Sequence, residues 1–155
     1  MLNKIKSMSS LTLSENKSSK ITKNPIVTIV TPAYNQGEYL EATMRSVLAQ
    51  DYQDLEYIVI DDGSSDDSLL VAKRVASEYP GQVTVLTKPN SGQAETLNIG
   101  WRMAKGEILG YLSSDDRLMP QAVSRMVDTL QKNPETSVAY CDFWLIDAAG
   151  HRLRE

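Results

Sequence analysis

Two pairs of adjacent aspartates constrain this chain more than any other feature of its sequence. Asp61 and Asp62 follow the apolar run 55–60, and Asp115 and Asp116 follow the apolar run 108–112. Each pair stands where a buried strand should end, and a helix-like stretch comes after it. In a parallel α/β sheet such strand ends open on one edge, where ligands bind. Four carboxylates repel one another there unless a cation or a hydrogen-bond donor compensates. A divalent metal carrying a phosphorylated ligand is the simplest arrangement that does so.

The composition predicts one globular domain. The chain has 155 residues, a net charge of -4 and 41% hydrophobic residues, which suits a single domain with a real core. No apolar run approaches the roughly 20 residues that span a bilayer. The lone Cys141 excludes an internal disulfide, fits the reducing cytoplasm and is expected to pack as a small apolar residue. The acidic balance and the lack of a basic stripe argue against nucleic acid as a partner.

Residues 1–24 differ from the rest of the chain. They are rich in serine, lysine, asparagine and threonine and show no sustained hydrophobic period. We therefore expect a disordered polar tail, followed by one domain over residues 25–155. The tail lacks the stretch of apolar residues that forms the centre of a signal peptide. Its lysines could contact an anionic surface, which leaves room for peripheral association with the inner face of a membrane, although a solvated tail is the preferred interpretation.

From residue 25 onward, predicted strands and helices alternate. Strands are expected at 26–31, 55–60, 83–86, 107–112 and 137–143. Helices are expected at 38–50, 64–79, 92–104 and from Pro120 to about residue 132. Ser64 and Asp67 have the spacing of a capping box at the start of the second helix. This alternation predicts an α/β fold with a mainly parallel sheet flanked by helices.

Every polar cluster of this region follows a predicted strand. The clusters are residues 31–35, 61–64, 88–93 and 113–116. By the rule for open α/β sheets, they should line one crevice. The sequence contains neither GxGxxG nor GxxxxGK[ST], so it has no dinucleotide fingerprint and no Walker loop.

Three of these clusters suggest specific chemistry. Tyr34 could stack on a planar base while Asp62 accepts a hydrogen bond from a ring N–H; alternatively, Tyr34 merely covers the end of the sheet. Asp115 and Asp116 are hard oxygen ligands suited to magnesium or manganese, which take one or two carboxylates and complete their shell with phosphate oxygens and water. Such a cation would ease departure of a diphosphate. The alternative is an acidic loop that caps the next helix.

Four motifs together resemble the family 2 glycosyltransferases, which have the GT-A (Rossmann-like) fold. They are residues 32–35 (PAYN), 59–66 (VIDDGSSD), 92–100 (GQAETLNIG) and 106–116 (GEILGYLSSDD). The similarity covers about residues 25–143, and the motifs occur in the order and spacing of the family.

The resemblance implies inverting transfer of a sugar from a nucleotide-diphosphate sugar, with a UDP-sugar favoured, to an acceptor hydroxyl. It implies a glycan or lipid-linked acceptor in bacterial cell-surface polysaccharide synthesis. Asp116 is favoured as the direct ligand of Mn²⁺ or Mg²⁺, together with Asp115. The implied nucleotide-binding residues are Pro32, Tyr34, Asn35, Asp61, Asp62, Gly63, Ser91, Gly92, Gln93, Asn98 and Asp115.

Two departures from the family qualify this interpretation. Ser113 stands where many members have Asp or Asn, although the two following carboxylates remain. Family catalytic domains typically extend on the order of 200 residues or more, so the fold is expected to be truncated at the C-terminus, with the catalytic base expected beyond Glu155. The alternative is a non-catalytic nucleotide-sugar-binding fragment. A response-regulator-like domain is disfavoured, because the region after Phe143 offers no lysine at the end of a last strand.

Overall fold

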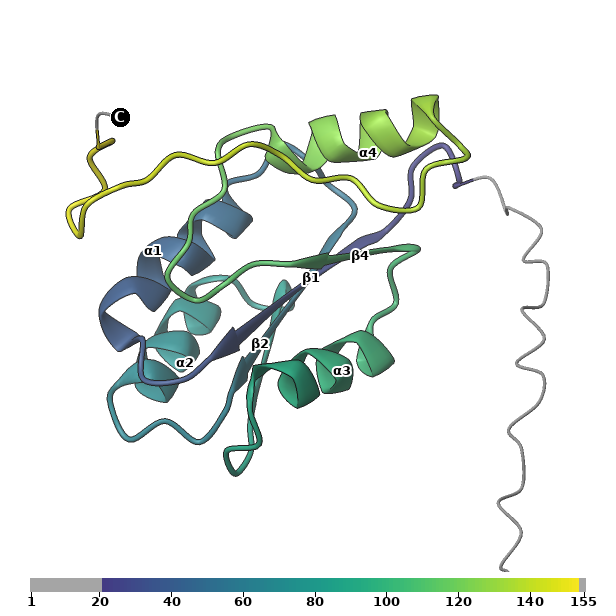
Figure 1. Cartoon of the computed structure of the whole chain (residues 1–155). Coiled ribbons are helices and arrows are strands. Elements are labelled where there is room, and N and C mark those ends of the chain that lie inside the picture. Colours follow the sequence, from purple (N-terminus) through teal and green to yellow (C-terminus); the bar gives the residue numbers. More distant parts are fainter. Residues whose placement is uncertain (1–20, 154–155) are drawn as a thin grey trace, which may run out of the picture.

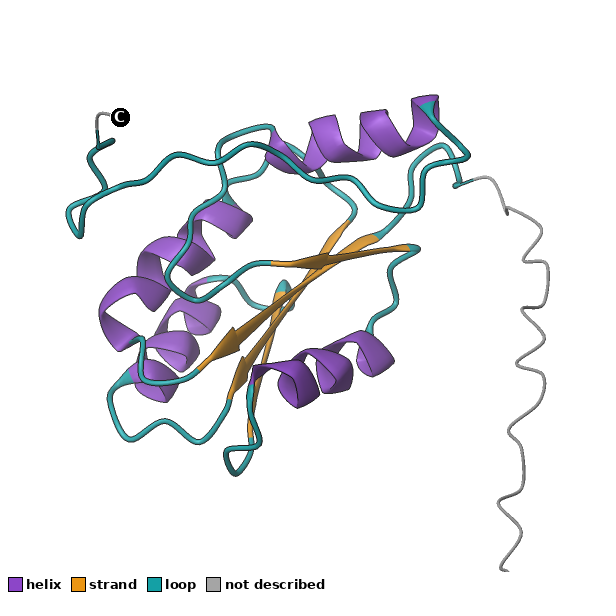
Figure 2. Cartoon of the chain, viewed as in Figure 1, coloured by secondary structure: helices purple, strands orange, loops and turns teal. Residues whose placement is uncertain are grey.

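The computed structural model describes residues 21–153 and contains one four-stranded parallel sheet, in the order β3-β2-β1-β4 (Figures 1 and 2). The strands are β1 (Val27–Ala33), β2 (Leu55–Asp61), β3 (Val83–Thr87) and β4 (Ile108–Tyr111). The helices are α1 (Gly37–Leu48), α2 (Ser68–Glu78), α3 (Gln93–Met103) and α4 (Ala122–Lys132). The predicted α/β class with a parallel sheet is confirmed.

Helices cover both faces of the sheet (Figure 1). On one face, α1, α2 and α4 pack on β1 and β2 in a core of Val27, Ile29, Ala33, Leu40, Met44, Val47, Tyr57, Val59, Ala72, Val75, Val123 and Val127. On the other face, α3 packs on Val30, Ile58 and Ile60 through Leu97, Ile99 and Trp101. All seven residues of β1 are buried, including Thr28 and Thr31, so this central strand shows no alternation of buried and exposed positions.

The fifth predicted strand is wrong. Residues 137–143 form no strand, and the only strand pairing within residues 133–153 is an isolated antiparallel bridge between Ile146 and Arg152. The segment is rich in strand-forming residues, but Val138, Tyr140 and Phe143 are exposed. A strand needs a neighbour for its backbone hydrogen bonds, and sequence propensity does not supply one.

Two smaller predictions are also wrong. Cys141 is exposed and does not pack in the core. The capping box does not form, because α2 begins at Ser68, after Asp67. The hydroxyl of Ser64 instead accepts a hydrogen bond from the backbone N–H of Asn35 at 3.0 Å, which ties two loops of the sheet edge together. Ser64, which has the sequence spacing of a helix cap, thus makes a contact between two loops instead.

Most of the predicted polar tail, residues 1–20, lies outside the described residues. The end of that tail is attached to the domain. The backbone N–H and hydroxyl of Thr22 donate to the carboxylate of Glu107, and the side-chain amide of Gln131 donates to the carbonyls of Thr22 and Lys23. Across residues 21–153, no helix combines the length and the apolar character needed to cross a membrane.

Candidate functional site

Strand register brings the predicted clusters to one edge of the sheet. Ala33, the last residue of β1, pairs with Asp61, the last residue of β2. The next residues, Tyr34 and Asp62, therefore leave the sheet side by side, and the backbone N–H of Asp62 donates to the carbonyl of Ala33 at 2.8 Å. On the opposite side of β1, β4 runs parallel, so the loop after Tyr111 opens on the same edge.

The loop after β1 contains one accessible ring and one residue used internally. Tyr34 is half exposed and is available to a ligand. Asn35 has a φ of 53°, a conformation that Asn tolerates better than most residues. Its side-chain oxygen accepts hydrogen bonds from the backbone N–H and hydroxyl of Ser65. Of these three predicted nucleotide-binding residues, Pro32 is buried within β1 and Asn35 bonds to Ser65. The half-exposed ring of Tyr34 is therefore the side chain best placed to meet a ligand.

Asp62 is almost fully buried and holds the loop that follows β3. Its Oδ1 accepts from the backbone N–H of Ser91 at 2.9 Å, and its Oδ2 from the backbone N–H of Gly92 at 2.9 Å. The ammonium of Lys88 also contacts Oδ1. Burial by itself would raise the pKa of Asp62, but the Lys88 ammonium and the two backbone donors outweigh it and hold this pKa below its usual value. Asp62 is therefore an ionised, fixed carboxylate.

Asp61 and Gly63 shape the turn on either side of Asp62. The carboxylate of Asp61 accepts from the hydroxyl of Thr87 at 2.9 Å and from the backbone N–H of Ser64 at 3.3 Å. Gly63 has a φ of +73°, and its α-carbon packs against the backbone of Asn90. In this structure both residues connect the loop after β2 to the loop after β3, so their visible role is to position Asp62.

The start of α3 connects to the end of β4. The side-chain amide of Gln93 donates to the hydroxyl of Tyr111, which is also hydrogen-bonded to the hydroxyl of Ser113. These hydrogen bonds connect α3 to Ser113, which lies two residues before Asp115. Asn98, also predicted to bind nucleotide, is exposed on α3. It lies ~7.5 Å further along the helix than Gln93, at the usual rise per residue, and thus farther from the sheet edge.

The second aspartate pair lies in a turn anchored to α1. The hydroxyl of Thr43 donates to the carbonyl of Ser114 at 2.8 Å in the protein interior. Asp115 and Asp116 are exposed and line a cavity of about 1450 Å³. Partial burial, and then the charge of Asp115, raise the pKa of Asp116 above its usual value. Tyr34 and Asp62 do not line this cavity. The two predicted parts of the site, Tyr34 with Asp62 and Asp115 with Asp116, therefore lie at the same edge of the sheet but not in the same cavity.

The aspartate pair has the chemistry of a site for a hard cation. Two adjacent carboxylates repel each other, which after partial burial is the second cause of the raised pKa of Asp116, and a cation would relieve that repulsion. No third Asp, Glu, His or Cys joins them to form a cage among residues 21–153. Magnesium typically uses only one or two carboxylates and completes its octahedron with phosphate oxygens and water. The residues present therefore fit a metal that arrives with a phosphorylated ligand.

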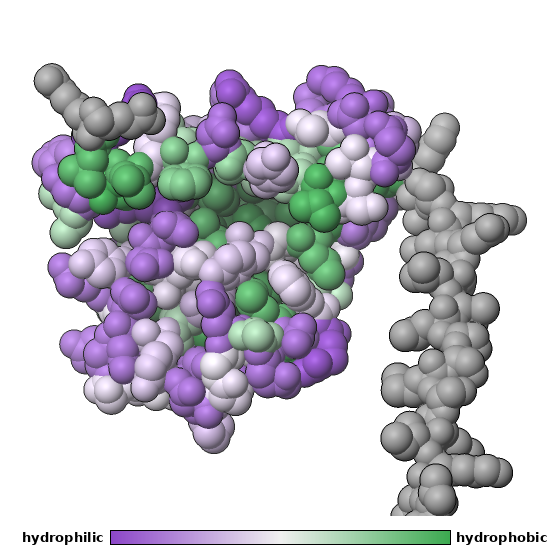
Figure 3. Space-filling view, viewed as in Figure 1, coloured by the Kyte–Doolittle hydropathy of each residue, from purple (hydrophilic) through white to green (hydrophobic). Residues whose placement is uncertain are grey.

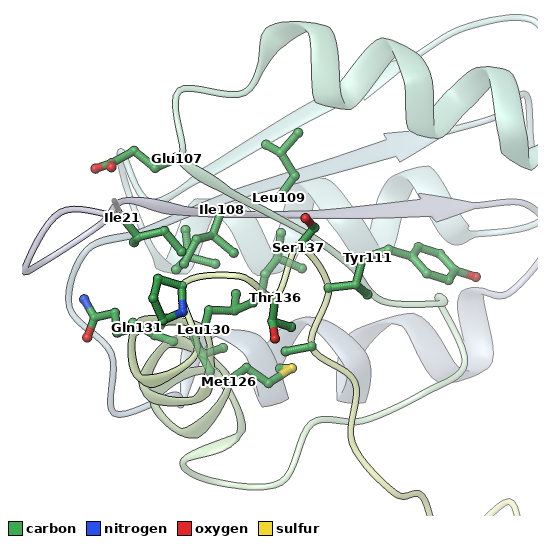
Figure 4. A pocket seen from close by; sticks show the side chains of 18 of the residues that line it. Ile21, Glu107, Ile108, Leu109, Tyr111, Met126, Leu130, Gln131, Thr136 and Ser137 are labelled. Carbon is green, nitrogen blue, oxygen red and sulfur yellow. The ribbon is translucent and has the colours of Figure 1, made fainter. Parts of the chain in front are cut away.

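A second cavity lies away from all predicted site residues. It has a volume of about 870 Å³ and opens between β4 and α4, where Ile108, Met126 and Leu130 line it (Figure 4). On the face shown in Figure 3, hydrophobic surface lies in a hollow between more polar rims. This cavity has no cluster of titratable groups, so it is a poor candidate for catalysis.

Sequence reasoning missed two residues of the candidate site. Lys88 was noted within its cluster but not singled out, although its ammonium contacts Asp62. Tyr111 was treated as part of a buried strand, yet its hydroxyl joins Gln93 to Ser113. A signal for Lys88 existed, because a lysine placed at the end of a strand beside two carboxylates is a natural counter-ion. Nothing in the sequence identified the partner of Tyr111.

Comparison with known proteins identifies the family. Residues 28–147 match the profile of Glycosyl transferase family 2. The chain belongs to this family. It is 34% identical over 133 residues to an uncharacterised glycosyltransferase of Rickettsia typhi, covering 85% of this chain and 41% of that protein. It is 33% identical to the chondroitin synthase of Escherichia coli, covering 88% of this chain and 20% of that protein. The predicted family is confirmed.

Solved structures confirm the GT-A fold. A mannosyltransferase from Pyrobaculum calidifontis, in complex with GDP-Man and Mn²⁺, aligns with a TM-score of 0.66 and 29% identity, over 70% of this chain and 33% of that one. Staphylococcus aureus TarS aligns with a TM-score of 0.62 and 23% identity, over 68% of this chain. This family 2 chain thus spans between a fifth and about two fifths of the length of the Rickettsia typhi protein, the chondroitin synthase and the mannosyltransferase.

Proposed function

We propose that this chain forms the donor-binding part of an inverting glycosyltransferase, which transfers a sugar from a nucleotide-diphosphate sugar to an acceptor hydroxyl. The observation that carries the proposal is the arrival of Tyr34, Asp62 and the Asp115–Asp116 pair at one edge of a parallel sheet, from three different strands. Family membership supports the reaction type, and the edge is where open α/β sheets bind ligands.

The nucleoside would lie across the ends of β1 and β2. Tyr34 offers an exposed ring for stacking on the base, an interaction typically worth about 1–3 kcal/mol per base. Asp62 emerges next to it and provides a fixed, ionised acceptor for a base N–H. We favour a UDP-sugar as donor. Tyr34 and Asp62 leave the sheet side by side because Ala33 and Asp61 are in register, which supports assigning both residues to the same ligand.

The diphosphate would lie at the end of β4. There, Asp115 would contact the ribose, and Asp116, with Asp115, would hold Mn²⁺ or Mg²⁺ against the phosphate oxygens. When bound, the metal would neutralise charge on the departing diphosphate. The related mannosyltransferase was solved with GDP-Man and Mn²⁺, which supports this assignment. The hydrogen bond from Thr43 to Ser114 fixes the turn that carries both carboxylates.

The acceptor side of the reaction is assigned to none of the described residues. An inverting displacement needs a carboxylate that takes the proton of the acceptor hydroxyl. Similarity to an O-antigen biosynthesis protein of Myxococcus xanthus, at 30% identity over 92% of this chain, supports a glycan or lipid-linked acceptor in bacterial surface polysaccharide synthesis. That protein is far longer, since the match covers 11% of it.

Calorimetry with UDP tests the proposal. The chain should bind UDP more tightly with Mn²⁺ than in excess chelator. Asp116→Ala should abolish this difference, whereas Asp62→Ala should weaken binding in both conditions. Asp128→Ala is the matched control, because Asp128 is an exposed aspartate on α4 paired with Lys132. Equal UDP affinity of the wild-type chain with metal and with chelator would remove the metal site from the proposal.

One alternative is a module that holds a nucleotide sugar without turnover. The specific observation in its favour concerns Asp142 and Asp147, the two other aspartates that line the cavity of Asp115 and Asp116. Both lie in the segment after α4 that forms no named strand, and Asp147 already accepts the backbone N–H of His151. Incubation with UDP-glucose and Mn²⁺ separates the two functions. Slow release of free UDP by hydrolysis, abolished by Asp116→Ala, supports a reactive donor site. Tight binding with no release supports the non-catalytic module.

A further inference from the structure

Lys88 is the first residue of the loop after β3, the loop that Asp62 holds through hydrogen bonds to the backbone of Ser91 and Gly92. Its side chain is 17% exposed, whereas that of Asp62 is 3% exposed, so a ligand approaching this corner meets the lysine first. The ammonium contacts Asp62 Oδ1 and donates to the hydroxyl of Ser91 at 2.6 Å. Its remaining contact, with the carbonyl of Pro89, is the longest at 3.3 Å. The N–H that donates to Pro89 is therefore the most weakly held of the three ammonium donors and the one that a better acceptor would take over.

Asp62 has one acceptor position left. An ionised carboxylate offers about four lone-pair positions on two oxygens. Oδ1 is used twice, by Lys88 and by the backbone N–H of Ser91, and Oδ2 is used once, by the backbone N–H of Gly92. The free position is on Oδ2. Lys88 thus has one weakly bonded donor, which contacts Pro89, next to the unfilled acceptor position of Asp62.

We propose that Lys88 determines the nucleobase specificity of this site, reading a ring carbonyl while Asp62 accepts the neighbouring ring N–H. This inference rests on the proposed function, because it assumes that the corner holds a base stacked on Tyr34. It selects bases that have a ring N–H beside a carbonyl, namely uracil, thymine and guanine. Lys88 is then a specificity-determining residue that contacts the ligand.

The other bases do not match this pair in the same position. With the ring held on Tyr34, cytosine places an unprotonated ring nitrogen opposite Asp62, and two acceptors then face each other. Adenine has no ring carbonyl for Lys88. A site whose buried polar groups are left unpaired rejects a ligand strongly. The GDP-Man of the related mannosyltransferase has a base of the selected kind.

A purely structural role for Lys88 makes a different prediction. The lysine also holds Ser91 and Asp62 together, so its loss could loosen the loop and weaken every nucleotide alike. The ratio of affinities for UDP and CDP distinguishes the two roles, because general loosening changes both affinities and leaves the ratio unchanged.

Calorimetry of the 155-residue chain in Mn²⁺, with UDP, GDP, CDP and ADP, tests the proposal. The wild-type chain should bind UDP and GDP at least about tenfold more tightly than CDP and ADP, as expected for a charged hydrogen bond. Lys88→Met should weaken UDP about tenfold and leave CDP nearly unchanged, and Lys88→Arg should restore the preference. Lys132→Met is the control, because Lys132 is an exposed lysine of α4 whose pair with Asp128 is on the surface.

Each outcome decides the matter. Equal weakening of UDP and CDP in Lys88→Met overturns the proposal and leaves Lys88 a loop-holding residue. A wild-type chain that binds all four nucleotides equally also overturns it, while the proposed donor site stands. No binding of any nucleotide by the wild-type chain overturns the proposed function itself. If Lys88→Met binds nothing, Lys88→Gln, which keeps an N–H donor, supplies the ratio.

Discussion

Gly63 lies in direct contact with the backbone of Asn90. A β-carbon built on Gly63 would be 2.7 Å from the amide nitrogen of Asn90, closer than real β-carbons approach. The loops after β2 and β3 therefore touch through their main chains. This contact brings the amides of Ser91 and Gly92 within 2.9 Å of the Asp62 carboxylate. The geometry of the candidate base-binding corner depends on a residue without a side chain.

Gly63→Ala should destabilise the fold strongly. The φ of +73° is unfavourable for alanine, at a cost of about 1–2 kcal/mol, and the clash with Asn90 adds to it. Gly81→Ala is the matched control, since Gly81 has a φ of +79° but nothing within 4 Å of an added β-carbon. Urea denaturation should show a clearly larger loss for Gly63→Ala. Equal losses would mean that the Asn90 contact relaxes without cost.

Gly100→Ala should also destabilise the chain, although alanine favours helices. A β-carbon on Gly100 would lie 2.5 Å from a methyl carbon of Val30, where α3 packs on β1. The helical gain of roughly 1 kcal/mol is then outweighed by overpacking of about 1–3 kcal/mol. In a double-mutant cycle measured by denaturation, Val30→Ala should make Gly100→Ala less harmful. Additive effects of the two substitutions would contradict this account.

The contribution of Asp62 to stability should depend on pH. Its pKa is lower in the folded chain than in the unfolded chain. The stabilisation is therefore present above the unfolded pKa of about 3.9 and is lost as the pH falls through the folded pKa. Asp62→Asn should cost about 1–3 kcal/mol at pH 7, and the gap to the wild type should narrow toward pH 3. Urea denaturation between these pH values measures the gap, with Asp128→Asn as control. A gap that stays constant over this range would show that the carboxylate charge is irrelevant.

Tyr34 should contribute to nucleotide affinity through its ring. If the proposed donor site is correct, Tyr34→Ala should weaken UDP binding about tenfold, since a stacked base is worth about 1–3 kcal/mol, both with Mn²⁺ and with chelator. Tyr34→Phe should stay within about twofold, because the phenyl ring keeps the stacking surface. Leu70→Ala, which truncates a 66% exposed side chain of α2 away from both cavities, is the control. Unchanged calorimetric affinity of Tyr34→Ala would assign Tyr34 to covering the sheet end.

The sequence by itself determined the order of elements and the edge where the site lies. Apolar runs at residues 26–31 and 55–60 became strands because each is long enough to be buried on both faces, and the helical period of 38–50 became α1. The aspartate pairs fell at strand ends, and parallel strands bring those ends together whatever the details of packing. The family motifs were visible in the same residues, since they are local in sequence.

Only the tertiary structure decided which partners the polar groups have inside the protein. Asp62 and Asn35 were predicted to meet a ligand and Ser64 to cap a helix, yet each bonds a residue 26 to 30 positions away along the chain. The sequence also could not show that residues 137–143 find no strand to pair with. Hydrogen-bond partners and strand neighbours are relations between distant segments, and local propensity does not encode the position of a distant segment. That is why the chain order predicted the edge of the sheet, while the bond between Gln93 and Tyr111 and the close approach of Gly63 to Asn90 emerged only from the folded chain.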